Sequence, residues 1–190
     1  MRAFVALVPP AEVVEHLDDF LAPRRDVAAF RWSVPEQWHV TLAFAASVPE
    51  RALDDLDERL ARVAGRCESF ELSVAGGGAF PDPDRARVLY ARLGGDRRTD
   101  DSLDRLAAGC RAAMSSAGAR VDDQRFRPHL TLGRLGRPAN VTSWVRLLDA
   151  YAGPGWRADE IALVGSHLRE GPRRRPRHEV VATYALGLSR

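Results

Sequence analysis

Apolar residues recur along the chain at helical spacing in some segments, and in short runs or strict alternation in others. The helical spacing predicts helices at 11–21, from a cap at Ser47 to Gly65, from about 100 to 117, and after a cap at Asn140. The short runs predict strands at 4–8, 70–75, 87–93, 160–168 and 180–188. Strands and helices alternate too irregularly for a doubly wound parallel sheet. The pattern therefore predicts an α+β fold with largely antiparallel sheets.

Two segments of the pattern depend on particular residues. Ser47 and Glu50 have the spacing of a capping box, which predicts that the second helix begins there. The run Gly76-Gly77-Gly78 lacks the Lys-Ser/Thr that follows the glycines of a phosphate-binding loop, so it predicts a turn or a bulge. No low-complexity linker interrupts the chain. Residues 1–190 are therefore expected to form a single domain.

Composition adds little that is specific. Of 190 residues, 45% are hydrophobic and 28% are charged, which is typical of a globular protein. The 28 basic residues are all arginines and stand against 26 acidic ones, for a net charge of +2. This charge does not require a long polyanionic partner, although it allows a short or terminal piece of nucleic acid.

The cysteines and the N-terminus bear on location. Cys67 and Cys110 are far apart in sequence and lie near no histidine at metal-ligand spacing, so we expect buried thiols in a reducing compartment. The apolar run from Phe4 to Val8 is too short for a signal peptide or a membrane span. These features predict a cytoplasmic protein with no membrane partner.

One short motif occurs twice: H-x-T-L stands at residues 39–42 and again at 129–132. Side chains alternate between the two faces of a strand. If each motif is a strand, its apolar residues share one face, and its histidine and threonine share the other. Strict alternation also places the small residues Ala43 and Gly133 beside each threonine, where they would leave room for a ligand.

Two imidazoles and two hydroxyls suit acid–base chemistry at phosphorus. A histidine titrates near pH ~6.5, so one imidazole can take a proton from water while the other gives a proton to the leaving oxygen. Thr41 and Thr131 could donate hydrogen bonds to the phosphate oxygens. Two histidines without a carboxylate or cysteine cluster make a poor zinc site, so no metal or other cofactor is expected.

Arginines near the second motif are further candidates for phosphate binding. By alternation Arg127 shares the face of His129, whereas Arg134 falls on the opposite face and would need a bulge or a strand end to reach the site. The arginine-rich loop at 173–177 could contact an RNA backbone or could simply be a solvated loop. Trp38 and Phe44 are expected in the core.

Taken together, these residues resemble the 2H phosphoesterase superfamily, and specifically the bacterial RNA 2′,3′-cyclic phosphodiesterases first called 2′-5′ RNA ligases. The resemblance also includes Arg2, Arg31-Trp32 before the first motif, and Ser166-His167-Leu168 near the C-terminus. It implies two pseudo-symmetric lobes with outer helices around a central cleft. We also expect a monomer. The resemblance also implies opening of a terminal 2′,3′-cyclic phosphate to a 2′-phosphate, with reversible 2′-5′ ligation in some members.

The resemblance assigns roles as well. His39 would be the proton donor, His129 the proton acceptor, and Thr41 and Thr131 the phosphate-binding residues. His178 stands about where an aromatic residue is usual, and neither it nor His167 is assigned to the site. Two alternatives remain open: a phosphodiesterase of a small cyclic nucleotide, and an RNA-end-binding module without turnover.

Overall fold

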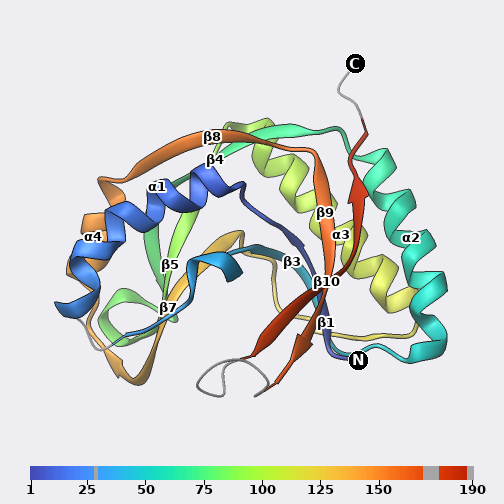
Figure 1. The fold of residues 1–190 in the computed structure, drawn as a ribbon, viewed down its shortest axis with the longest axis horizontal. Helices are drawn as coiled ribbons and strands as arrows, with labels where there is room; N and C mark the ends of the chain where they lie inside the picture. The colour runs from blue at the N-terminus through green and yellow to red at the C-terminus, as the bar shows by residue number, and fades with distance from the viewer. Residues whose placement is uncertain (28–29, 169–175, 188–190) are drawn as a thin grey trace.

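The fold is α+β, as predicted. The computed structural model describes residues 1–27, 30–168 and 176–187 (Figure 1). Its strands are β1 (Ala3–Leu7), β2 (Arg31–Trp32), β3 (Val40–Ser47), β4 (Phe70–Phe80), β5 (Ala86–Gly94), β6 (Arg120–Val121), β7 (His129–Ala139), β8 (Ala152–Ala158), β9 (Glu160–His167) and β10 (Arg177–Ala185). Its α-helices are α1 (Ala11–Leu21), α2 (Leu53–Arg66), α3 (Arg97–Ser116) and α4 (Thr142–Asp149).

All ten of these described strands belong to one sheet, and every ladder between them is antiparallel. The main order is β10-β9-β1-β3-β7-β5-β4-β8, with β2 beside β7 and β6 beside β3. At the centre, β3 and β7 are joined by the single pair Val40–Leu130. We call β10, β9, β1, β3 and β6 the first lobe, and β7, β5, β4, β8 and β2 the second lobe.

The helices divide between the lobes in the same way. Helices α2 and α3 pack together and against β10 and β3 of the first lobe, whereas α4 packs on β4 and α1 on β8 of the second. In Figure 1 the two pairs lie at opposite ends of the curled sheet. Each lobe thus has four long strands and two outer helices, although its strands come from distant parts of the chain.

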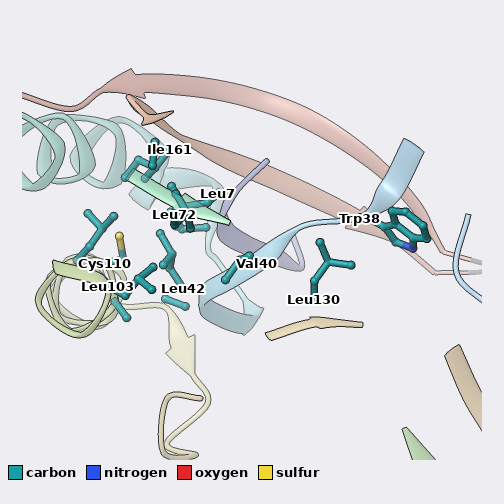
Figure 2. Close-up of a cluster of buried hydrophobic side chains, with 14 of the residues drawn as sticks. Leu7, Trp38, Val40, Leu42, Leu72, Leu103, Cys110, Leu130 and Ile161 are labelled. Atoms are coloured by element: carbon teal, nitrogen blue, oxygen red, sulfur yellow. The ribbon is translucent and has the colours of Figure 1, made fainter. Parts of the chain in front are cut away.

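A continuous apolar core joins the two lobes at their central strands. Val40 is fully buried and Leu130 is 1% exposed, and both belong to the main core cluster. Figure 2 shows them close together, with Leu7, Leu42 and Leu103 further along the same core. Full burial of a side chain of this size contributes about 1.5–3 kcal/mol. The strand faces opposite the motif histidines therefore hold the two lobes together.

The predicted capping box at Ser47 is wrong. Ser47 pairs with Arg120 in the ladder between β3 and β6, so its backbone is still in a strand. The chain then turns at Pro49, passes through a 3₁₀ turn (Glu50–Ala52) and begins α2 at Leu53. Helix α3, by contrast, begins three residues before the predicted start, because an Asp96 carboxylate oxygen accepts a hydrogen bond from the backbone N–H of Thr99.

The glycine run is a bulge inside a strand. Strand β4 continues through it to Phe80, and the ladder with β5 shifts register between Val74 and Gly77. Gly76 has a φ of +83°, which favours glycine. Strands β2, β6 and β8 were not predicted. Arg173, Arg174 and Arg175 lie outside the described residues. None of the described helices is long and apolar enough to cross a bilayer.

Candidate active site

The two H-x-T-L motifs lie side by side on the central strands. Because Val40 pairs with Leu130 in an antiparallel register, Thr41 falls opposite His129, and His39 falls opposite Thr131. Opposite residues share a face, and neighbours alternate. The four polar side chains therefore lie on the face opposite the buried Val40 and Leu130. We call this the histidine face.

Each motif strand has a β-bulge at the leucine of its motif. In the first lobe Thr41 pairs with Ala6 but Ala43 pairs with Val5, so Leu42 is the extra residue. In the second lobe Thr131 pairs with Tyr90 but Gly133 pairs with Leu89, so Leu132 is the extra residue. The same irregularity at the same motif position supports the pseudo-symmetry of the lobes.

The bulges overturn the strict alternation expected beyond the threonines. Ala43 is 4% exposed and belongs to the main core, and a Cβ on Gly133 would come within 3.2 Å of Phe30. These residues are small because they pack against the core, so they do not line a ligand space beside the threonines as expected. Trp38, at 3% exposed, lies in the core as predicted.

Beyond each bulge the next residue turns to the histidine face. In the first lobe it is Phe44, which pairs with Phe4 and packs on a small separate cluster with it, so Phe44 is not in the main core as expected. In the second lobe it is Arg134, which pairs with Val88 on the same face of β5 as Tyr90. Strict alternation placed Arg134 on the opposite face unless a bulge or a strand end intervened, and the bulge at Leu132 shifts the alternation by one residue.

Both imidazoles are held by the same backbone interaction. His39 Nδ1 lies 2.7 Å from the carbonyl oxygen of Gln37, and His129 Nδ1 lies 2.6 Å from that of Arg127. A carbonyl oxygen only accepts, so Nδ1 carries a proton in each ring. Each neutral imidazole then has its lone pair on Nε2, the atom that can exchange a proton with a ligand.

Aromatic rings surround each histidine, and they differ between the lobes. His39 stacks on Phe4 with ring centroids 4.5 Å apart, and the edge of His178 meets it at 5.5 Å. His129 makes edge contacts with Phe80 at 4.9 Å and Tyr90 at 5.3 Å. Each histidine therefore contacts two rings, and all four of these rings belong to strands of the sheet.

His178 is a site residue that sequence reasoning missed. It also meets Phe4, with ring centroids 5.0 Å apart. It lies far from both motifs in sequence, and the β10–β9–β1 ladders bring it to His39 by pairing His178 with Ser166 and Val164 with Phe4. The departure from an aromatic residue at this position was the one signal available.

Burial favours the neutral form of the site histidines. The pKa of His39 is lowered to about 4, first by burial and then by the nearby imidazoles of His178 and His129, against the raising effect of the Gln37 carbonyl. Burial also lowers the pKa of His129, and Arg134 adds to this lowering. The pKa of His178 is lowered by burial and by Arg2. Because His129 contributes to the lowering of the pKa of His39, the two imidazoles are close enough to interact electrostatically.

Arginines stand next to the rings in both lobes. The guanidinium of Arg127 lies over Phe80, 5.8 Å from the ring centroid, and Phe80 in turn touches His129. The guanidinium of Arg2 lies over Phe44 at 4.3 Å. Arg127 and Arg134 are both exposed. The two arginines predicted for phosphate binding are therefore on the same side of the second lobe as His129.

The remaining polar groups of the face are the two threonines. Thr41 and Thr131 are partly exposed, and neither hydroxyl forms a hydrogen bond with another described residue. Both can donate to a ligand. Within the described ranges, no three or more His, Cys, Asp or Glu side chains are grouped as metal ligands. A cavity of about 550 Å³ is lined by Arg66, Cys67, Thr99 and Arg157 among others, and it contains neither motif.

An antiparallel α+β fold whose central strands each present a histidine and a threonine on one face defines a two-histidine phosphoesterase. The model of the 2′-5′ RNA ligase superfamily matches residues 5–170. The chain belongs to this family, as the resemblance implied.

Named relatives and solved structures agree with the assignment. The RNA 2′,3′-cyclic phosphodiesterase of Thermus thermophilus is 32% identical over 90% of this chain and 85% of its own length. That of Aeropyrum pernix is 37% identical over 60% of this chain, and the match spans 61% of its own length. The crystal structure of the protein TT0787, also from Thermus thermophilus, has a TM-score of 0.80 and 29% identity, with complete coverage of both chains.

Proposed function

We propose that this protein hydrolyses the terminal 2′,3′-cyclic phosphate of RNA to a 2′-phosphate by metal-independent acid–base catalysis. The mirrored histidines carry the proposal: each donates its Nδ1 proton to the backbone carbonyl two residues earlier, so each Nε2 is free for proton transfer. Relatives that bear the name RNA 2′,3′-cyclic phosphodiesterase support the choice of substrate.

In this mechanism the cyclic phosphate binds against both imidazoles. His129 Nε2 takes a proton from water as the water oxygen bonds to phosphorus. The bond between phosphorus and the 3′-oxygen breaks, and His39 Nε2 gives a proton to that oxygen. Each proton transfer supplies roughly 10²–10⁴-fold in rate. The strain of the five-membered ring already lowers the barrier. A 5′-hydroxyl in place of water would give a 2′-5′ linkage, which is the reversible ligation of the family.

The donor has to acquire its proton as the substrate arrives. With its pKa lowered to about 4, His39 is neutral in the free protein near pH 7. A phosphate anion beside an imidazole favours the charged form and raises its pKa. The negative charge of the bound substrate therefore favours the protonated form of His39, which then acts as the acid. The opposite assignment, with His129 as donor, describes the reverse reaction.

The neutral and cationic groups around the histidines would hold the phosphate. Thr41 and Thr131 donate hydrogen bonds to its non-bridging oxygens, where charge develops in the transition state. Arg127 adds paired donors from the second lobe, and Arg134 adds positive charge beside it. The arginines also offset the extra negative charge of the transition state.

The test uses an oligoribonucleotide that ends in a 2′,3′-cyclic phosphate, incubated with the protein in a metal chelator. We expect turnover and a 2′-phosphate product. Absence of turnover with and without chelator would refute the activity, and loss only with chelator would refute the metal-free mechanism. A 3′-phosphate product would refute the proposed bond cleavage. The cytoplasmic location and the monomeric state remain predictions from the sequence.

A further inference from the structure

Two arginines from different strands lie directly opposite each other beside the second motif. In the short ladder between β2 and β7, Arg31 pairs with Arg134 and Trp32 pairs with Gly133. Opposite residues share a face, and Arg134 is on the histidine face beyond the bulge. Arg31 therefore lies on the histidine face as well, one strand further along.

The packing of Trp32 on the other face of β2 fixes the orientation of Arg31. Trp32 packs against Phe30 and Trp144, with ring centroids 5.0 and 5.3 Å apart, and its indole N–H donates to the carbonyl oxygen of Arg25. The backbone N–H of Ser33 donates to the carbonyl oxygen of Leu132 at 2.8 Å. Trp32 is anchored in the aromatic cluster on one face of β2. Because neighbouring side chains of a strand alternate, Arg31 must lie on the opposite face, which is the histidine face.

The charges of the pair are not compensated by any acidic residue that the structure describes. Like charges directly opposite in an antiparallel pair destabilise a sheet. Both guanidinium groups are exposed, and neither forms an ion pair with a described residue. Arg92 of β5, which pairs with His129 of β7, differs in this respect. Its guanidinium forms an ion pair with Asp149 at 2.8 Å. An uncompensated arginine pair beside a phosphate-binding site points to an anionic group of the ligand.

We propose that Arg31 and Arg134 together bind a second phosphate of the substrate, the 5′-phosphate of the nucleotide that carries the 2′,3′-cyclic phosphate. This subsite makes the enzyme specific for RNA ends over free cyclic mononucleosides. It rests on the function proposed above, since it places that substrate on the histidine face.

The spacing of the residues fits two phosphates. Arg134 is three residues beyond Thr131, less than about 10 Å along a bulged strand. It is near enough to His129 to lower the pKa of that imidazole. Arg31 extends the positive charge away from the histidines, onto β2. The cyclic phosphate would thus lie between the threonines, and the next phosphate along the RNA would reach the planar forks of the two arginines.

The substrate set that tests this consists of a nucleoside 2′,3′-cyclic phosphate, the same compound with a 5′-phosphate, and a dinucleotide ending in the cyclic phosphate. Only the last two carry the second phosphate. For the Arg31→Gln variant we expect kcat/KM to fall about tenfold more for these two than for the first, the effect of one charged hydrogen-bonding group. The wild-type preference should also weaken with salt, and the variant should show a shallower salt dependence.

Two further variants keep the result interpretable. Arg31→Lys retains the charge without the fork and should fall between wild type and Arg31→Gln. Arg146→Gln changes an exposed arginine on the outer helix α4 and should leave all three rates unchanged. A melting curve verifies folding, and Arg31→Gln should melt no lower than wild type because it removes a like-charge contact. An equal loss for all three substrates, or no loss, would overturn the subsite. Failure of wild type to turn over any of them would instead refute the proposed function.

Discussion

The two lobes present the same motif in different surroundings. In both, a histidine bonds the carbonyl two residues earlier, a threonine follows, and a bulge at the leucine turns the strand. The residue after the bulge then differs: Phe44 in the first lobe and Arg134 in the second. Both histidines contact aromatic rings, but only the second lobe has an arginine directly after the bulge, and this arginine lowers the pKa of His129. A shared backbone geometry supports a symmetric pair of imidazoles, and the side chains around it make the pair unequal.

The largest expected effect is the loss of either imidazole. We expect His39→Ala and His129→Ala each to lower kcat for a cyclic-phosphate oligonucleotide by roughly 10²–10⁴-fold, because each removes one proton transfer. If the two act as a unit, the double variant should lose little more than either single one. Single-turnover rates measure all three. A near-normal rate in one single variant would remove that histidine, and with it the equivalence of the lobes.

The threonines come next. Thr41→Val and Thr131→Val keep the β-branched shape but remove a donor aimed at the phosphate, and we expect kcat to fall by about 10–10³-fold in each. Thr183→Val, an exposed strand threonine on β10, is the matched control and should leave kcat unchanged. Similar losses at Thr41 and Thr131 would support symmetric binding of the phosphate. A loss at one threonine alone would show that a single lobe holds it.

The pH dependence of the free energy of unfolding distinguishes the histidines of the two lobes in the absence of substrate. In the unfolded chain an imidazole titrates near pH ~6.5, whereas His39 stays neutral in the folded protein down to about pH 4. Between these values the unfolded state binds the extra proton, so the free energy of unfolding falls as the pH falls. We expect His39 to account for about 1–2 kcal/mol of this fall, allowing for partial exposure. Denaturant titrations of His39→Gln and His129→Gln from pH 7 to 4 should show a flatter dependence for the first than for the second. Equal slopes would contradict the comparison.

Sequence reasoning reached the motif faces as far as the threonines, because two-residue alternation is a local property of a strand. It failed one residue later, at Ala43 and Gly133, because a bulge depends on the partner strand and leaves no mark in the motif itself. It likewise missed the pairing of Arg31 with Arg134, which comes from a two-residue ladder too short to recognise by periodicity.

The capping box failed for a related reason: Ser47 is used by the ladder with Arg120, a long-range contact that outweighs a local signal. Helix α1, by contrast, has the bounds that were predicted, since its apolar stripe and the prolines before it are local. The fold class followed from local patterns, whereas the composition of the site depended on which strands lie side by side.

The smallest expected effect concerns His178, the residue that most distinguishes the surroundings of His39. Phe at this position can keep the edge contacts with His39 and Phe4, so we expect His178→Phe to change kcat by no more than about threefold. It also removes an imidazole that lowers the pKa of His39, while the imidazole of His129 remains. The limb of the kcat/KM profile that reports the titration of His39 should therefore move to higher pH. His178→Ala loses the contacts as well and should lower kcat further. His167→Phe is the control, because its imidazole pairs with Glu179 and should not affect the limb. An unchanged limb in His178→Phe would show that His178 only fills space beside His39.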